Sequence, residues 1–274
     1  MKIYMSVDME GITGLPDATF VDWRKHNYER SRKIMTDEAN YIIQAAFDYG
    51  VEEVLVNDSH SKMNNLLIDQ LHPDALLITG ESKPFSMMQG LNATYSGVFF
   101  AGYHARAGQR GVMTHSMIHA IRNIYINDHC VGEMGMNAYL AGYFGVPVLL
   151  VSGDDQAAME AEKLIPYITT AVVKETISRA SVKSLTPKKA GQLLAEKVKL
   201  ALDRKQLVAP LVPPEAPELT MEFNNSGQAE WADLMPGTIW IPGTTKVRFQ
   251  AKDMKEAYQA MLVMTELAVQ TTFS

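Results

Sequence analysis

The chain opens with a short alternation of polar and apolar residues. Residues 2–7, KIYMSV, place an apolar side chain at every second position, which is the period of a strand with one buried face. The alternation ends at Asp8 and Glu10, two carboxylates separated by one residue. In an extended strand end, residues i and i+2 point the same way. We therefore expect both acids to face one site, while Met9 turns back into the core.

Strand and helix patterns then alternate through the first half of the chain. Apolar residues recur at helical spacing over 29–49, which predicts an amphipathic helix that Gly50 ends. The other elements expected in this half are strands at 51–56, 74–79, 96–102 and 146–155, a hairpin over 118–131 that turns near Asn127 and Asp128, and helices at about 133–144 and after residue 155. This alternation predicts an α/β fold with a mainly parallel sheet flanked by helices.

The order of elements changes from about residue 167. The elements expected there are a strand over 169–178, a helix over 187–204 that begins at Thr186 and Pro187, an extended proline-rich connector over 207–218, a strand over 219–223, a helix opened by Asn225 or Ser226, a strand pair within 237–250, and a final helix capped by Asp253 and Glu256. We therefore predict two domains, an α/β domain over 1–165 and a smaller C-terminal α+β domain over 166–274.

Composition narrows the class of protein. The chain has 274 residues, of which 47% are hydrophobic and 20% charged, as in a globular protein with room for two cores. Its net charge of −6 comes without a basic run, which argues against a nucleic-acid partner. The most apolar segment, 138–151, is shorter than the roughly 20 residues of a membrane span. The N-terminal apolar run ends at Asp8, unlike a secretion signal. We expect a cytoplasmic protein with no membrane partner.

The predicted strands of the first half are followed directly by acids and histidines. Asp8 and Glu10 follow the first strand, His60 follows the second, and His104 follows a later one. The carboxyl ends of parallel strands lie side by side, so these four residues are expected to meet at one edge of the sheet. The single cysteine, Cys130, leaves only oxygen and nitrogen ligands for a metal site. Such a set suits Zn²⁺ or Mn²⁺.

Each of these residues also has an ordinary structural explanation. Asp58 and Ser59 are typical helix caps, and a single histidine after a strand is commonly a turn residue. Glu133 is an acid favourably placed at the N-terminus of a predicted helix. His115 is either a loop histidine or an imidazole that transfers protons beside a metal. Spacing alone leaves these alternatives open, and the sequence contains no dinucleotide-binding, phosphate-loop, serine-hydrolase or H-E-x-x-H motif.

Six segments carry a resemblance to a known family: SVDMEGI, VNDSHSKMNN, GYHARAG, MTHSM, VGEMGMNAYLAGYFGVPV and QAEWADLMPGT. Together they make the chain similar to the zinc-dependent D-aminopeptidase family over essentially its whole length. The resemblance implies an aminopeptidase with two Zn²⁺ per subunit that hydrolyses short peptides with an N-terminal D-residue, such as D-Ala-D-Ala. It also implies a homo-oligomer, a decamer whose interior channel encloses the active sites.

The same resemblance implies roles for six residues. The implied metal ligands are Asp8, Glu10, His60, His104 and Glu133. Asp8 would bridge the two zinc ions, Glu10 and His104 would complete one site, and the other two ligands would complete the second. His115 would be the catalytic residue, as a nucleophile or as a proton shuttle. The 1–165 domain would then be catalytic, and the 166–274 domain would serve assembly and complete the pocket.

Three other classes of protein fit part of this pattern. A metal-dependent phosphoesterase would use the same ligand set, but it would need basic residues near the site, and Arg106 is the only close candidate in these loops. A binding subunit for dipeptide uptake would not need a metal pair. A structural ring protein would turn over no substrate. Selectivity for D-residues would come from the shape of the pocket, which the sequence does not reveal.

Overall fold

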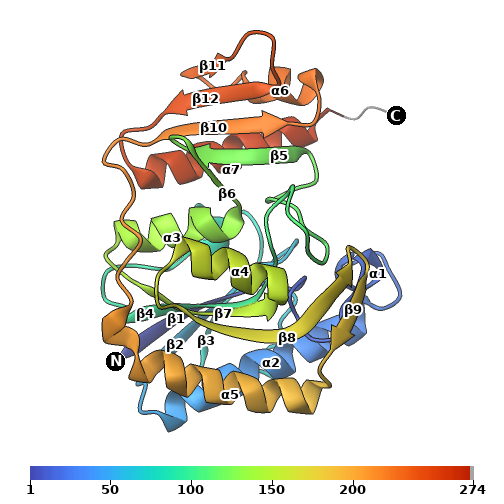
Figure 1. Ribbon diagram of the computed structural model, residues 1–274, viewed down its shortest axis with the longest axis vertical. Helices are drawn as coiled ribbons and strands as arrows, with labels where there is room; N and C mark the ends of the chain where they lie inside the picture. The colour runs from blue at the N-terminus through green and yellow to red at the C-terminus, as the bar shows by residue number, and fades with distance from the viewer. Residues whose placement is uncertain (272–274) are drawn as a thin grey trace.

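Two sheets organise the chain in the computed structural model, which describes residues 1–271 (Figure 1). The first sheet has seven strands, which in spatial order are β3 (Leu76–Ile78), β2 (Glu53–Asp58), β1 (Lys2–Val7), β4 (Gly97–Tyr103), β7 (Val148–Asp154), β8 (Thr169–Ser178) and β9 (Ser181–Ser184). All neighbouring pairs are parallel except β8 and β9. The predicted α/β fold with a mainly parallel sheet is therefore confirmed.

Helices cover both faces of this sheet. They are α2 (Tyr28–Asp48), α5 (Pro187–Asp203), α3 (Glu133–Tyr143), α4 (Asp155–Leu164) and the short α1 (Ala18–Val21). In Figure 1, α2 and α5 lie below the sheet, and α3 and α4 lie above it. Gly50 ends α2 as predicted, since its φ of +99° is the left-handed conformation that glycine adopts readily. None of the helices in the described chain has the length and apolar character that a membrane span requires.

The second sheet is antiparallel and has its own helices. Its five strands, in spatial order, are β11 (Thr238–Trp240), β12 (Lys246–Gln250), β10 (Glu218–Phe223), β5 (Ile121–Ile126) and β6 (His129–Val131). The helices are α6 (Ser226–Ala232) and α7 (Met254–Val269), with the predicted caps at Asn225 and Asp253. Figure 1 shows α7 between this sheet and α3, so α7 joins the two layers.

The two sheets do not divide the chain at the predicted domain boundary between residues 165 and 166. The strand expected at 169–178 in the second domain is β8, which pairs with β7 in the first sheet. The hairpin of β5 and β6, expected with the first domain, pairs with β10 in the second sheet. The reason for the first difference is that β7, α4 and β8 form one more βαβ unit, which adds a parallel strand to the sheet. Helix α5 packs on α2, and after α5 the chain passes to the second sheet through the extended connector that ends at β10.

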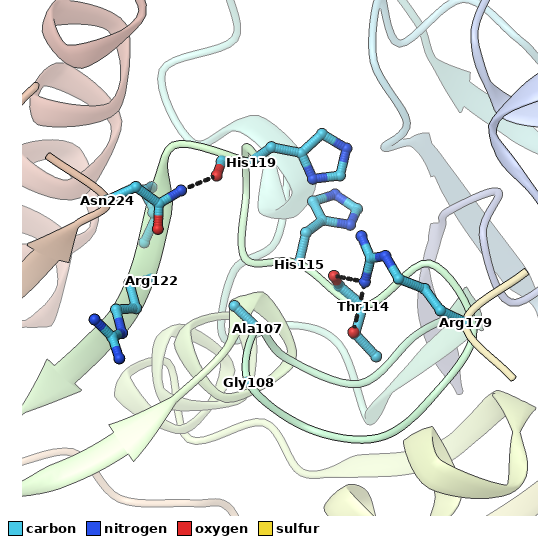
Figure 2. A pocket seen from close by; sticks show the side chains of 9 residues that line it. Ala107, Gly108, Thr114, His115, His119, Arg122, Arg179 and Asn224 are labelled. Atoms are coloured by element: carbon cyan, nitrogen blue, oxygen red, sulfur yellow. Dashed lines mark hydrogen bonds between the residues drawn. The ribbon is translucent and has the colours of Figure 1, made fainter.

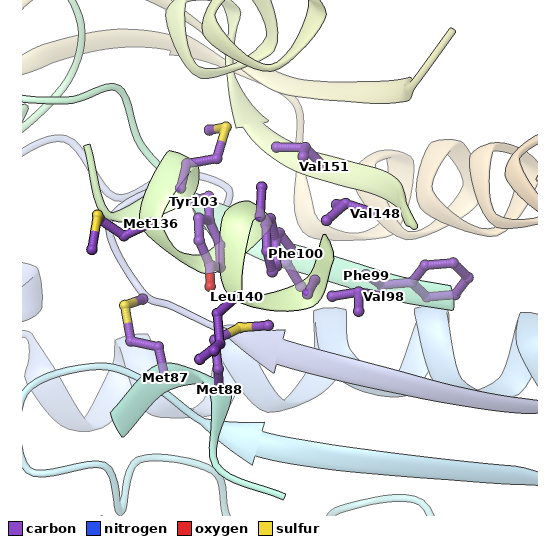
Figure 3. Close-up of a cluster of buried hydrophobic side chains, with 14 of the residues drawn as sticks. Met87, Met88, Val98, Phe99, Phe100, Tyr103, Met136, Leu140, Val148 and Val151 are labelled. Carbon is purple, nitrogen blue, oxygen red and sulfur yellow. The ribbon is translucent and has the colours of Figure 1, made fainter. Parts of the chain in front are cut away.

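A buried cluster fixes α3 on the first sheet (Figure 3). Met136 and Leu140, four residues apart on one face of α3, pack over β4 and β7. The rings of Phe100 and Tyr103 stack beneath them with centroids 4.5 Å apart. The short 3₁₀ helix η1 (Ser86–Met88) closes the other side of the cluster. This packing matters for function because α3 begins at Glu133, at the edge of the sheet where the first strands end.

Replacing Leu140 by alanine tests how firmly this cluster holds α3. Leu140 is fully buried, so Leu140→Ala should lower the free energy of unfolding by about 2–5 kcal/mol through lost burial and a residual cavity. Urea unfolding followed by circular dichroism measures the change. A matched control is Val263→Ala on α7, whose side chain is 45% exposed and whose loss should change stability by no more than about 0.5 kcal/mol. Equal effects of the two substitutions would contradict the packing described.

Candidate metal centre

Five predicted site residues meet at the carboxyl edge of the first sheet. Asp8 and Glu10 follow β1, His60 follows β2, His104 follows β4, and Glu133 begins α3. Strands β2, β1 and β4 are neighbours and parallel, which is why residues far apart in sequence lie together. All five are buried, with 2–7% of each residue exposed. The convergence expected from strand ends is therefore present, and Glu133 joins it from a helix N-terminus.

The acids and histidines form two groups that share Asp8. His60 Nδ1 lies 3.3 Å from Asp8 Oδ1 and 3.0 Å from Glu10 Oε2. His104 Nε2 lies 3.6 Å from Asp8 Oδ2 and contacts Glu133 Oε1. The two oxygens of Asp8 thus face different histidines. This division differs from the expected one, because Glu10 makes its closest contact with the histidine of β2 and Glu133 with the histidine of β4.

Backbone carbonyls fix the orientation of both histidine rings. His60 Nε2 donates a hydrogen bond of 2.8 Å to the carbonyl of Val21, and His104 Nδ1 donates one of 3.0 Å to the carbonyl of Ala105. A carbonyl only accepts, so the hydrogen of each neutral ring sits on the nitrogen that faces it. The other nitrogen of each ring then directs a lone pair at the acids. Metal-binding histidines are commonly held in this way by a carbonyl behind the ring.

With both rings neutral, no hydrogen lies between the ring nitrogens and the acids they contact, so several buried polar atoms of the cluster have no hydrogen-bond partner. These atoms are Glu10 Oε2, His104 Nε2 and Glu133 Oε1. A buried carboxylate oxygen without a partner costs free energy, and a divalent cation would remove that cost. The available donors are carboxylate oxygens and imidazole nitrogens, which are ligands that zinc prefers. Groups of three side chains offer ligand atoms within 4.8 Å of one another. The residues therefore fit a metal centre.

The charges of the cluster point to the same conclusion. Burial raises the pKa of Asp8, and the neighbouring Glu10 carboxylate raises it further. Burial opposes the charged form of each histidine, but Glu10 outweighs this effect at His60, and Glu133 outweighs it at His104, so both pKa values lie well above the usual one. Three acids thus face only two imidazoles. The site attracts positive charge, which protons or metal ions can supply.

His115 lies beside this cluster on the loop after β4. Its ring stacks on His104 with centroids 4.2 Å apart, and its Nε2 lies 4.0 Å from Glu10 Oε1. Its Nδ1 donates a hydrogen bond of 2.9 Å to the carbonyl of Met113, so Nε2 of the neutral ring carries the lone pair. Burial and the neighbouring His104 lower the pKa of His115. The ring is therefore neutral near neutral pH and able to accept a proton at Nε2.

Two buried charged residues that the sequence analysis missed support the loop that carries Asp8 and Glu10. Lys174 of β8 is fully buried and donates from Nζ to the carbonyls of Glu10, Ile12 and Leu15. Glu38 of α2 accepts a hydrogen bond of 2.9 Å from the backbone of Thr13. The one available signal was a lysine that directly follows three apolar residues within a predicted strand.

Gly11 allows the same loop to lie against β4. A β-carbon at this position would come within 2.1 Å of the Tyr103 carbonyl oxygen, and the N–H of Gly11 donates a hydrogen bond of 2.7 Å to the carbonyl of Gly102. Any larger residue would push the loop away from the strand. The glycine between the acids and the next turn therefore sets how closely Asp8 approaches the end of β4.

A buried chain of hydrogen bonds lies behind the cluster. Asn137 of α3 accepts from the Tyr258 hydroxyl of α7 at 2.7 Å and donates to the Tyr103 hydroxyl of β4 at 2.9 Å. The Tyr103 hydroxyl in turn lies 2.7 Å from Ser6 Oγ on β1. This network ties α7, α3, β4 and β1 together immediately before the site residues. Asn137 stands in the segment GEMGMN, so its position in that motif is explained by structure rather than by metal binding.

Two other residues considered from the sequence lie outside the cluster. Asp58 accepts hydrogen bonds from the backbone of Asn65 and Leu66 and so holds the loop after β2; no helix begins there, so the helix-capping interpretation is wrong. Arg106 donates from Nη1 to the carbonyl of Ala107, and its own N–H donates to Glu160. The only basic residue expected near the site therefore does not reach the acids.

Comparisons with known proteins agree with this geometry. A family model described as peptidase M55, D-aminopeptidase, matches residues 1–263. A curated D-aminopeptidase of Bacillus subtilis (strain 168) is 66% identical over 273 residues, which is 100% of both chains. A solved structure described as the Zn-dependent D-aminopeptidase DppA from Bacillus subtilis, a self-compartmentalizing protease, is 65% identical and superposes with a TM-score of 0.99 over 100% of both chains.

Replacing Glu38 by glutamine should change how stability depends on pH. Burial raises the pKa of Glu38 from 4.5 to about 7, so between these values the folded chain keeps a proton that the unfolded chain has lost. The stability of the wild-type chain should therefore fall relative to Glu38→Gln as the pH rises through this range, by about 3 kcal/mol in total. Urea unfolding of both proteins with a chelator present measures the difference. Parallel stability curves between pH 4.5 and 7 would contradict it.

Proposed function

The chain belongs to the peptidase M55 family of D-aminopeptidases, and we propose that it hydrolyses short peptides with an N-terminal D-residue, such as D-Ala-D-Ala. It is a zinc-dependent metallopeptidase, like the Bacillus subtilis enzyme whose fold it shares. One observation carries the proposal for the site. Three carboxylates and two imidazoles are buried together at one sheet edge, with atoms that lack hydrogen-bond partners and face one another.

We assign two zinc ions to this cluster. Asp8 would contribute to both, because its two oxygens face different histidines. Glu10 and His60 would complete the protein ligands of one ion, and His104 and Glu133 those of the other. Bound zinc supplies a Lewis acid for the scissile carbonyl and lowers the pKa of water toward about 7.

His115 is the residue that we propose for proton transfer. Its neutral ring presents the lone pair of Nε2, and the hydrogen bond from Nδ1 to Met113 holds the ring in that orientation. The imidazole can take a proton from the attacking group at Nε2 and return it to the leaving amine, as a general base and then a general acid. A nucleophilic role would use the same nitrogen. The stacked ring of His104 keeps the distance between this nitrogen and the cluster short.

The phosphoesterase alternative is not favoured. The family model and the 66% identical relative are both D-aminopeptidases. Arg106, the basic residue expected for the alternative, donates from its guanidinium to the carbonyl of Ala107 and does not reach the acids. The relatives decide against the alternative, since another arginine, Arg179, lines the same cavity as His115. A binding subunit for dipeptide uptake or a structural ring protein would have no use for buried acids that lack hydrogen-bond partners.

We also propose that the chain acts as a homo-oligomer, and specifically as a decamer. The support is that the similar Bacillus subtilis structure is described as a self-compartmentalizing protease. Trp231 of α6, Leu234 of the turn after it and Ile239 of β11 expose apolar side chains, which a neighbouring copy would cover. We therefore propose assembly contacts on the second sheet, and the assembly role expected for the C-terminal part stays a prediction. A cytoplasmic location stays a prediction.

A comparison of stereoisomers tests the proposed substrate class. The zinc-loaded protein should release alanine from D-Ala-D-Ala at least about tenfold faster than from L-Ala-L-Ala, since one misplaced methyl group commonly changes kcat/KM by that much. Chiral chromatography of the products measures both rates. A phosphodiester assayed on the same sample tests the alternative. Preference for the L,L peptide, or hydrolysis of the phosphodiester alone, would contradict the proposal.

Replacing His115 by alanine separates catalysis from metal binding. His115→Ala should keep the zinc content of the wild-type protein while kcat falls by about 10²–10⁴-fold, the usual contribution of a general acid–base. Metal analysis and D-Ala-D-Ala hydrolysis on the same sample measure the two effects. The exposed His129 on the β5–β6 hairpin provides a matched control, and His129→Ala should keep full activity. Full activity of His115→Ala would exclude both roles proposed for this residue.

A further inference from the structure

A small cavity lies beside His115, and Figure 2 shows the residues that line it. Its volume is about 220 Å³. The residues that line it are Ala107, Gly108, Thr114, His115, His119, Ile121, Arg122, Arg179 and Asn224. His115 belongs both to this lining and to the group around Glu10, so the cavity lies beside the residue proposed for proton transfer. It is smaller than the roughly 300–1,000 Å³ of pockets for drug-sized ligands, which suits one or two small residues of a peptide.

The lining of the cavity is positively charged. It contains Arg122 and Arg179, and none of its nine described residues carries a carboxylate. This contrasts with the metal centre next to it, which holds three acids. A substrate that spans both places would therefore present opposite charges to them, with its amine at the acidic end and an anionic group at the arginines. A short peptide with a free C-terminus has this arrangement of charges.

Arg179 is held in place at the tip of the β8–β9 hairpin. Its carbonyl accepts a hydrogen bond of 3.0 Å from the N–H of Met113. Its Nη1 donates to the carbonyl of Thr114 at 2.6 Å and to the Thr114 hydroxyl at 2.9 Å. Figure 2 shows the guanidinium beside the ring of His115. The backbone carbonyl and the guanidinium of Arg179 are thus both hydrogen-bonded to the two residues that precede His115. Within residues 1–271, no carboxylate forms an ion pair with this guanidinium.

Arg122 is placed differently at the same cavity. Its side chain is 68% exposed, and its Nε lies 3.9 Å from Glu222 Oε1. Figure 2 shows it extending away from His115. Part of its charge is therefore balanced by a neighbouring acid, and it is less well placed than Arg179 to bind a group that reacts near His115.

We propose that Arg179 binds the C-terminal carboxylate of the substrate, which makes the enzyme selective for very short peptides with a free C-terminus. The proposal rests on the D-aminopeptidase function given above and adds the feature that selects its substrates. A guanidinium and a carboxylate form paired, charge-assisted hydrogen bonds, and an anchored arginine loses little freedom when it forms them. A longer peptide would carry its carboxylate beyond the cavity and would lose this contact.

If Arg179 had only a structural role, its substitution would affect substrates differently from the loss of a carboxylate-binding group. The hydrogen bonds to Thr114 show that Arg179 also holds the loop before His115. If that were its whole role, a substitution would slow all substrates by the same factor. The ratio of kcat/KM for a free acid to kcat/KM for the matching C-terminal amide therefore separates carboxylate binding from loop support.

The experiment measures this ratio for D-Ala-D-Ala and D-Ala-D-Ala amide. The zinc-loaded wild-type protein should prefer the free acid by about tenfold, as expected for one charge-assisted contact. Arg179→Gln should abolish this preference, mainly through KM for the free acid, while the amide is still hydrolysed. The matched control is Arg110→Gln, an exposed arginine of the same loop region that does not line the cavity, and it should keep the wild-type ratio.

Three results would overturn the proposal. An unchanged ratio in Arg179→Gln would show that Arg179 only supports the loop. Loss of the preference in Arg122→Gln but not in Arg179→Gln would assign carboxylate binding to the other arginine. Hydrolysis of neither peptide by the zinc-loaded wild-type protein would overturn the proposed D-aminopeptidase function, and this inference with it.

Discussion

The site depends on one constraint, the electrostatic interaction among three carboxylates and two imidazoles. These groups are buried together at the carboxyl edge of one sheet. Acids so close together out of water do not all stay ionised unless positive charge lies among them. Backbone carbonyls turn each imidazole so that a lone pair faces the acids. Both ring nitrogens are thereby committed, one to the protein and one to the centre. Zinc ions satisfy this arrangement better than protons, since they accept the lone pairs and neutralise the acids together.

Packing and hydrogen bonds from the rest of the fold hold these charged side chains in position. The loop with Asp8 and Glu10 is fastened from below by Lys174 and from α2 by Glu38, both buried. Helix α3 brings Glu133 to the same edge because its apolar face packs on β4 and β7 and its Asn137 is bonded on two sides. Each ligand therefore comes from an element fixed by core packing, and the site does not rely on flexible loops for its geometry.

Local pattern predicted most of the elements and part of the site. The two-residue and 3.6-residue periods located β1, α2, β7 and α7 to within a few residues, and the rule that strand ends meet predicted the convergence of Asp8, Glu10, His60 and His104. Pattern alone did not assign Glu133, because its place at a helix N-terminus favoured a structural explanation over metal binding; the family resemblance implied the metal-binding role.

The remaining features depend on tertiary contacts that local pattern does not contain. The pairing of Glu10 with the histidine of β2 depends on the path of the loop past Gly11. The membership of β8 in the first sheet, and with it the placement of Lys174 and Arg179, depends on which strand edge was free. The central claim is that this cluster works as a zinc centre, and one measurement tests it most directly: zinc content and D-Ala-D-Ala hydrolysis on one purified sample, before chelation, after it, and after zinc is restored. The account predicts about two zinc ions per subunit, in accordance with the two ligand groups, and activity that is lost and regained with them. Full activity in the metal-free protein would contradict it.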